Sequence, residues 1–130
     1  MGKLLVVSAH PDDESYGCGG TLAKHGAAGD DLYWLIVTKA DEAFGWSEDA
    51  LRRRQAEISE VSTLFGFRKT FTLDYPTVRL DAVPKWELIK RVDEVVSEVE
   101  PDENLTTEAG GTLMFTVVLD SMPTADVIVS

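Results

Sequence analysis

The sequence predicts an α/β fold, in which an open, doubly wound parallel sheet carries helices on both of its faces. Two short and almost wholly apolar runs, Lys3–Ser8 and Leu32–Thr38, have the pattern of strands that are covered on both sides, and the first is expected to lie centrally in the sheet. A segment with helical features follows each of them. Strands that alternate with helices favour a parallel sheet, whose functional site is expected beyond the carboxyl ends of its strands.

The first two helices have ends that the local sequence specifies. The first is expected over about Cys18–Lys24, with His25 in its last turn and Gly26 as its stop. A polar loop then leads to a long helix over about Ser47–Phe65. Its serine is a typical N-cap, the acidic residues that follow complement the helix dipole, and Gly66 ends the helix.

A third strand is expected over Lys69–Leu73, where apolar residues alternate, and residues 75–77 (Tyr-Pro-Thr) should break it. Pro84 then opens a helix that runs to Val99, and Pro101 closes it. The apolar positions expected near one face of this helix are Trp86, Ile89, Val92, Val96 and Val99.

Length and composition predict a single α/β domain over residues 1–130, because 44% hydrophobic residues can supply one core. The formal net charge of −11 argues against nucleic acid or an anionic membrane as a partner, since their phosphates would be repelled. Cys18 is the only cysteine, which excludes an intramolecular disulfide. No apolar stretch approaches the roughly 20 residues that cross a bilayer, so there is no membrane span and the expected location is cytoplasmic.

The segment Ala9–Glu14 places one histidine and three carboxylates directly after the first strand. An imidazole and hard carboxylate oxygens suit zinc or a similar divalent ion. Pro11 biases His10 toward an extended backbone and fixes its own φ, so the turn is partly preformed. The alternative is a solvated acidic turn in which an aspartate caps the next helix, but the strand in front favours a metal site.

This segment resembles the opening signature of the PIG-L/LmbE-like family of zinc-dependent de-N-acetylases. The resemblance extends to about Asp102, and its further matches are Gly19-Gly20-Thr21-Leu22, Thr38, Arg54-x-x-Glu57 and Leu64-Phe65-Gly66. It implies a Rossmann-like, LmbE-like α/β fold. It also implies a hydrolase that removes acetyl from N-acetylated sugars, with a small N-acetylglucosamine-type molecule as substrate.

The resemblance also implies the roles of individual residues. His10 and Asp13 would be zinc ligands, Asp12 the general base and Arg54 a contact to the substrate. Zinc, or another divalent metal, would lower the pKa of water and polarise the acetyl carbonyl, while Asp12 takes the proton. Glu14 is expected beside the ligands or at the start of the helix rather than as a catalyst.

Residues 103–130 depart from the family pattern, so the fold looks truncated or altered after residue 102. Family members carry a pair of histidines there and then an Asp-Leu-Asn-x-Asp-His-Arg type of motif, whose histidine completes the zinc site. His10 and His25 are the only histidines of this chain. Because His25 is expected roughly 10 Å from the site, at 1.5 Å per helical residue, the third ligand is missing.

Two explanations of this tail stay open. Codon degeneracy permits a shifted reading of residues 111–118 as Asp-Leu-Asn-Val-His-Arg-Arg, and of residues 105–107 as containing a His-His pair. Alternatively, the tail has evolved away from catalysis. A neighbouring subunit of a homo-oligomer could then supply the third histidine, or the chain could be a catalytically silent α/β binding or structural module with a weak metal site.

For the arginines of the second helix and the tryptophan of the loop before it, the sequence allows a functional or a purely structural role. Two of the three consecutive arginines, Arg52 to Arg54, are expected on a solvated helix face, paired with acidic neighbours. Trp46 stands in the loop that should overhang the site. It could stack on a sugar ring or pack against the first helix.

Overall fold

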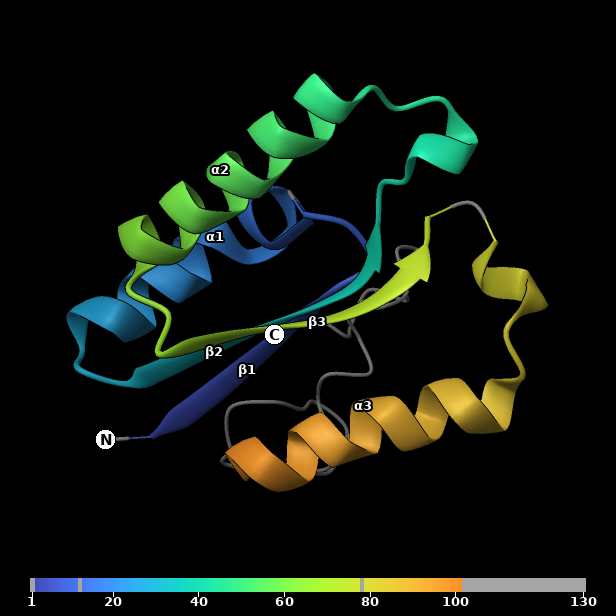
Figure 1. Cartoon of the computed structure of the whole chain (residues 1–130). Helices are drawn as coiled ribbons and strands as arrows, with labels where there is room; N and C mark the ends of the chain where they lie inside the picture. Colours follow the sequence, from blue (N-terminus) through green and yellow to red (C-terminus); the bar gives the residue numbers. More distant parts are fainter. Residues whose placement is uncertain (1, 12, 78, 102–130) are drawn as a thin grey trace.

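The structure is a computed structural model that describes residues 2–11, 13–77 and 79–101. Three parallel strands form one sheet in the order β1-β2-β3 (Figure 1). The strands are β1 (Lys3–Ser8), β2 (Asp31–Lys39) and β3 (Lys69–Pro76). The helices are α1 (Asp13–Ala27), α2 (Glu48–Phe65) and α3 (Lys85–Val99), with short 3-10 turns η1 (Glu42–Phe44) and η2 (Leu80–Ala82). The predicted α/β class with an open parallel sheet is confirmed.

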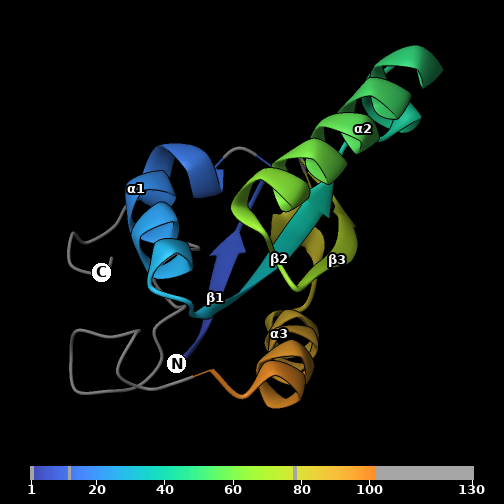
Figure 2. The ribbon, with the colours of Figure 1, turned by 90° about the vertical axis from the view of Figure 1, so that its left-hand side faces the viewer.

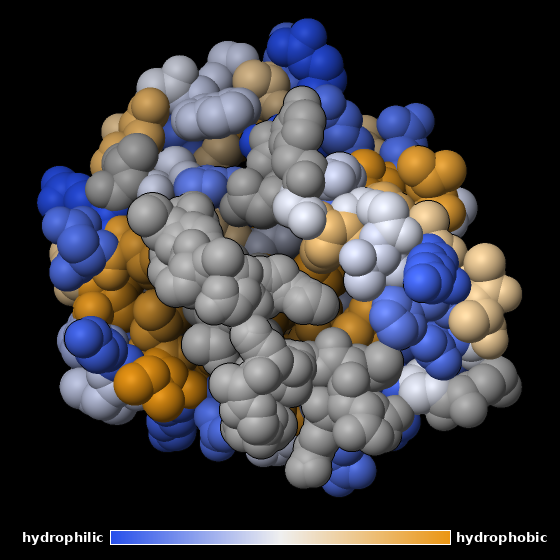
Figure 3. All heavy atoms as spheres, turned by 180° about the vertical axis from the view of Figure 1, so that it is seen from behind, coloured by the Kyte–Doolittle hydropathy of each residue, from blue (hydrophilic) through white to orange (hydrophobic). Residues whose placement is uncertain are grey.

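Helices cover both faces of the sheet, because alternate side chains of each strand point in opposite directions. α1 and α2 lie on one face and α3 lies on the other (Figure 1, Figure 2). The core on the α1/α2 side comprises Leu4, Val6, Leu22, Leu32, Trp34 and Ile36. The core on the α3 side comprises Leu5, Val7, Leu35, Val37, Leu73, Tyr75, Val92, Val95 and Val99. Seen from behind, hydrophobic residues also lie at the surface among hydrophilic ones (Figure 3).

β1 has the burial that its sequence predicts but not the expected position. None of the residues from Leu4 to Val7 is more than 8% exposed, so both faces of the strand are covered. A central place in the sheet is wrong for the part of the chain that the structure describes, where β1 pairs only with β2 and β2 is the middle strand. Burial on two faces comes from the helices above and below, and an outer strand can receive it as well as an inner one.

α2 begins and ends as the sequence predicts. The side chain of Ser47 accepts a hydrogen bond from the amide of Ala50 at 3.1 Å, as an N-cap does. Gly66 follows the helix with φ 74°, a left-handed conformation that glycine adopts without strain. Its amide donates to the carbonyl oxygens of the last turn. Among the described residues, every helix is too short or too polar to cross a membrane.

α1 differs from its predicted extent at both ends. It begins at Asp13, and the backbone leaves helical geometry at Cys18 (φ −146°, ψ 25°), where two helical segments meet at a kink. The glycines around the kink have low helix propensity, so the sequence indicated a helix start there. Gly26 is not the stop, because the helix continues to Ala27 and Gly29 takes the left-handed conformation (φ 90°).

β3 continues through the segment that was expected to break it. Ile36 of β2 pairs with Thr72, whereas Thr38 pairs with Tyr75, so β3 contains one extra residue and forms a β-bulge. At the bulge, Asp74 adopts a left-handed backbone conformation with φ 60°, which aspartate tolerates better than most residues. Beyond the bulge, the Tyr75 hydroxyl donates to a carboxylate oxygen of α3 at 2.9 Å.

The buried face of α3 is also only partly as predicted. Val92 and Val99 are buried as expected, and Val96 is partly buried. Trp86 and Ile89 are 67% and 60% exposed, so their place in the apolar face was wrong. The buried stripe instead passes through Leu88, Val92, Val95 and Val99, and Leu88 is partly buried.

Candidate functional site

The carboxyl ends of the three strands are joined by hydrogen bonds around Thr38. Thr38 lies near the end of β2 and is 3% exposed. Its amide donates to the carbonyl oxygen of Ala9 at 3.1 Å, and its hydroxyl donates to the same oxygen at 2.7 Å. Its Oγ1 also lies 3.4 Å from Oγ1 of Thr77, which follows β3, and the amide of Thr77 donates to the carbonyl oxygen of Lys39 at 3.2 Å. At the edge of the sheet predicted to carry the site, hydrogen bonds therefore link the carboxyl ends of all three described strands.

His10 lies exposed at this edge, between Ala9 and Pro11. The acidic turn leads directly into α1, which begins at Asp13. Asp12 and the side chain of Asp13 lie outside the described residues, so their roles stay predictions. Among the residues that the structure does describe, no three His, Cys, Asp or Glu side chains form a group that could hold a metal. The imidazole of His10 suits zinc, but this part of the chain supplies only part of a donor set.

Glu14 is a buried carboxylate in the first turn of α1. It is 2% exposed, and the hydroxyl of Ser15 donates to its Oε1 at 3.1 Å. Its position at the start of the helix is the expected one, since negative charge is favourable at a helix N-terminus. Burial and, to a lesser degree, the charge of Glu14 raise the pKa of the Cys18 thiol to about 11.

The raised pKa of Cys18 predicts a thiol that resists alkylation. At pH 8 only about one thiol in a thousand is ionised when the pKa is about 11, and the thiolate is the reactive form. The rate of reaction with iodoacetamide should therefore be low at pH 8 and should keep rising up to about pH 11. The same protein in urea is the control, and its rate should level off about one pH unit above the ordinary cysteine pKa, near pH 10. A folded protein whose rate levels off at the same pH as in urea would contradict this prediction.

Arg54 and Trp46 lie together at the start of α2. The guanidinium carbon of Arg54 lies 5.9 Å from the centre of the Trp46 ring, a cation–π contact, and Trp46 is 36% exposed. Arg52 instead pairs with Glu48 and Asp49, at 3.0 and 3.6 Å.

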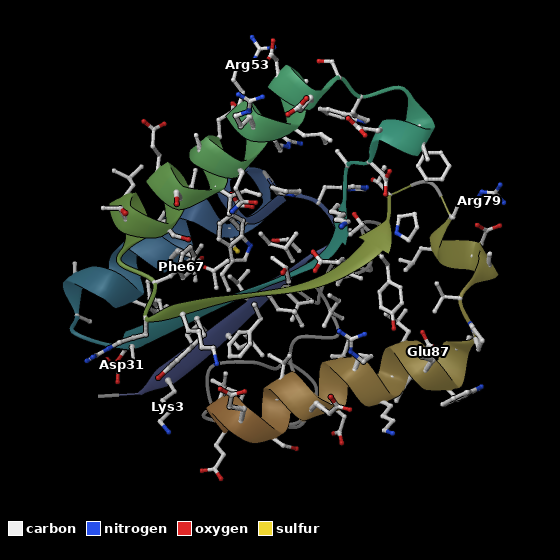
Figure 4. The ribbon with its side chains drawn as sticks, viewed as in Figure 1. Lys3, Asp31, Arg53, Phe67, Arg79 and Glu87 are labelled. Carbon is white, nitrogen blue, oxygen red and sulfur yellow. The ribbon has the colours of Figure 1, made fainter. Side chains whose placement is uncertain are left out.

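Two further arginines, Arg53 and Arg79, lie near the pair formed by Arg54 and Trp46 in the sequence or at the same edge of the sheet, and neither has an acidic partner in the part of the chain that the structure describes. Arg53 is exposed and points away from the sheet (Figure 4). Two of the three consecutive arginines are thus on a solvated face, as predicted, although only Arg52 has acidic partners among the described residues. Arg79, at the opposite end of the molecule from Asp31 in Figure 4, lies 6.0 Å from the ring centre of Phe44 in η1.

His25 is held far from this edge. Its Nδ1 lies 2.7 Å from Oδ2 of Asp30, and Oδ1 of Asp30 accepts from the amide of Gly2 at 2.9 Å. The Gly2 amide, together with the His25 ring, lowers the pKa of Asp30. Because Gly2 and Asp30 precede β1 and β2, His25 belongs to the amino edge of the sheet. The expectation that it cannot replace the third ligand is supported.

A parallel sheet covered on both faces, with a histidine at the carboxyl end of its first strand and an acidic turn after it, defines an α/β protein with a candidate metal site. The chain belongs to the PIG-L family: the family model, described as GlcNAc-PI de-N-acetylase, matches residues 5–115.

Known relatives of this chain include several deacetylases. A 1D-myo-inositol 2-acetamido-2-deoxy-alpha-D-glucopyranoside deacetylase of Kineococcus radiotolerans is 29% identical, over 84% of this chain and 39% of its own length. A diacetylchitobiose deacetylase of Thermococcus kodakarensis is 32% identical, over 60% of this chain and 31% of its own length. The chain thus spans less than half the length of either relative.

Solved structures share the fold. A conserved protein of Thermus thermophilus superposes with a TM-score of 0.61 at 33% identity, over 78% of this chain and 44% of its own. The N,N'-diacetylchitobiose deacetylase of Pyrococcus horikoshii superposes with a TM-score of 0.63 at 23% identity, over 87% of this chain and 45% of its own.

Sequence reasoning did not assign a place at this edge to Thr77, Phe44 or Arg79. The sequence predicts Thr77 only as part of the break after the third strand. A hydroxyl residue at or just after the end of each of two neighbouring strands was the signal that could have pointed to it, since such side chains meet at the edge of a parallel sheet. The contacts of Phe44 and Arg79 leave no comparable pattern in the sequence.

Proposed function

We propose that this protein has the fold and site of a zinc-dependent hydrolase that removes the acetyl group from an N-acetylated sugar of the N-acetylglucosamine type, and that in its present form, with two assigned metal ligands, it is weakly active or inactive. The observation that carries the proposal is the exposed histidine, His10, at the carboxyl end of a buried strand and directly before an acidic turn, in a chain of a de-N-acetylase family. The deacetylase names of the relatives support the same reaction and an acetylated sugar as the small-molecule substrate.

In this proposal His10 and Asp13 hold the metal, and full activity requires a third donor, such as a histidine of a neighbouring subunit. Bound zinc, or another divalent ion, supplies a Lewis acid that lowers the pKa of water and polarises the acetyl carbonyl. Asp12, next to a ligand in the chain, takes the proton from the attacking water and returns it to the leaving amine. Arg54 contacts the sugar, and its contact with Trp46 limits the positions of its guanidinium.

Zinc binding should be weak and should depend on His10. Only His10 and Asp13 are assigned as ligands, whereas a catalytic zinc site normally has three protein ligands. Titration calorimetry of metal-free protein should therefore give a low affinity that is lost in His10→Gln. His25→Gln is the matched control, because it changes the other histidine at the opposite edge, and it should bind zinc as the parent does. Tight stoichiometric binding that survives His10→Gln would locate the site elsewhere.

Arg54→Lys should weaken the binding of an N-acetylglucosamine derivative by about 10–100-fold, because one hydrogen bond to a charged group contributes about 1.5–3 kcal/mol. The fluorescence of the neighbouring, part-exposed Trp46 offers a signal for the titration. Arg52→Lys is the control. Its ion pairs are with exposed carboxylates of its own helix, so the affinity for the sugar should not change. Equal losses in both variants would argue against Arg54 as a substrate contact.

A catalytically silent binding or structural module remains the second candidate, and the single observation that favours it is the count of two histidines in the chain. A third histidine from a neighbouring subunit of a homo-oligomer would restore the enzyme. For either candidate we propose a reducing, cytoplasmic setting, since the chain has one cysteine and that cysteine is free.

A further inference from the structure

We propose that Thr38 is a positioning residue for His10 and acts through the peptide bond between Ala9 and His10. The importance of His10 as a metal ligand rests on the proposed function. The positioning itself is a property of the metal-free protein and can be tested without zinc. Thr38 touches neither a ligand nor the substrate in this proposal, since its effect passes through the main chain.

The carbonyl oxygen of Ala9 is held by two donors from one residue. The Thr38 amide and the Thr38 hydroxyl donate to it at 3.1 and 2.7 Å. A carbonyl oxygen has two lone pairs, so this oxygen is fully used. Because Thr38 is 3% exposed, water does not compete with its hydroxyl for the position.

Fixing this oxygen also fixes the start of His10. The oxygen of Ala9, the amide nitrogen of His10 and the two flanking α-carbons lie in one peptide plane. Two donors in different directions resist both displacement and rotation of that plane. The α-carbon of His10 is therefore placed by Thr38, although the His10 side chain itself is exposed.

Pro11 restrains His10 from its other side. A residue before proline is confined to extended values of ψ, because the proline ring clashes with more compact ones. With the preceding peptide plane held by Thr38 and its own ψ restricted by Pro11, the main chain of His10 has little freedom left. Neither of these two contacts acts on the side-chain torsions of His10, and a bound metal would select among them.

The Thr38 hydroxyl is itself oriented by its surroundings. It has one proton and two acceptors in reach: the carbonyl oxygen of Ala9 lies at 2.7 Å and Oγ1 of Thr77 at 3.4 Å, so the proton goes to the nearer oxygen, that of Ala9. Thr77 lies at this level because the β3 bulge adds one residue before it and because its amide is bonded to Lys39 at the end of β2. On the β1 side, Ser8 is already held by the indole N–H of Trp34 at 2.9 Å, which leaves Ala9 as the last link before His10.

The test compares Thr38→Val, which keeps the shape and removes the hydroxyl, with Thr38→Ser, which keeps the hydroxyl. In metal-free protein, nuclear magnetic resonance should show that Thr38→Val shifts the signals of the Ala9 carbonyl carbon and the His10 amide, and that Thr38→Ser leaves them near their parent positions. The zinc dissociation constant should rise about 10–100-fold in Thr38→Val and return to the parent value in Thr38→Ser, a loss typical of residues that orient a metal ligand.

Thr70→Val is the matched control for a lost hydrogen bond. The Thr70 hydroxyl lies 2.6 Å from the hydroxyl of Ser62, near the amino end of β3. Its loss should lower the melting temperature but leave the Ala9 and His10 signals and the zinc affinity unchanged. If Thr38→Val does not fold, Thr38→Ala takes its place, since it differs from Thr38→Ser by the hydroxyl alone.

The proposal is overturned if the hydroxyl-free Thr38 variant keeps the parent signals of Ala9 and His10, if Thr38→Ser fails to restore them, or if Thr70→Val moves them equally. A different result would refute the proposed function. A parent protein that binds no zinc would refute the metal site, and the signals of metal-free Ala9 and His10 would still decide whether Thr38 positions this turn.

Discussion

The Val6→Asp protein should not fold. Val6 is 5% exposed and packs with Leu22 of α1 and Trp34 of β2 in the core on the α1/α2 side of the sheet. A carboxylate at this place would be buried without a partner, which costs on the order of 3–5 kcal/mol in addition to the lost packing. Since a domain of this kind is stable by only about 5–15 kcal/mol, thermal melts should show a lost or strongly lowered transition.

Thr72→Asp is the control for an aspartate in the same sheet. Thr72 lies on β3 and its side chain is exposed, so this variant should melt close to the parent. A Val6→Asp protein that melts like the parent would mean that the face of β1 that carries Val6 is open to water, and the covering of the sheet by α1 and α2 would be wrong.

The second large effect concerns Asp12. The chain as it stands should hydrolyse N-acetylglucosamine derivatives slowly or not at all, because two assigned ligands hold a metal weakly. A version in which residues 105–107 and 111–118 carry the histidines of the shifted reading should gain zinc affinity and deacetylase activity together. In that version, Asp12→Asn should lower turnover about 10²–10⁴-fold and leave zinc bound, because it removes a base and not a ligand.

The other outcomes would change the assigned function or the role of Asp12. Strong zinc-dependent deacetylation by the present chain as a pure monomer would contradict the need for a third histidine. A version with added histidines that binds zinc but hydrolyses no acetylated sugar would favour the binding module. Loss of zinc in Asp12→Asn would assign Asp12 as a ligand instead of a base.

Local chemistry explains which elements could be predicted. β1 has the bounds that its apolar run indicated, Lys3–Ser8. α2 begins after an N-cap serine and ends at a left-handed glycine, and both signals act within a few residues of the helix end. The histidine and acidic turn after β1 predicted a site at the carboxyl edge of the sheet, which is where His10 lies.

The predictions that were wrong concern features that depend on contacts between residues far apart in the sequence. The order of the strands depends on where the helices pack, and no pattern within β1 reports it. In α3, helical periodicity is compatible with both the predicted and the observed apolar face, since Val92 and Val99 belong to both. The choice between Trp86 and Leu88 depended on the shape of the sheet surface beneath. The bulge at Asp74 likewise depends on how β3 pairs with β2, which the sequence of β3 alone does not determine.

The candidate site was predicted as a list of residues and only in part as an arrangement. The sequence placed His10 and Arg54 by motif, and the structure adds that Trp46 contacts Arg54. The threonine bonds that join the strand ends link residues 29 and 39 positions apart. Such links are invisible to reasoning within a local window.

The parallel pairing of the described strands also bears on how the chain reaches its native state. No described strand pairs through a hairpin: β1, β2 and β3 are each separated by a helix, so every ladder closes a long loop before its first bond forms. Loop closure costs entropy in advance of contact, and topologies rich in distant contacts fold slowly. The edge that carries His10 should therefore mature in the same late, cooperative step as the sheet. A partly folded chain would hold its helices yet lack metal affinity, so zinc uptake during refolding would report the completion of the fold.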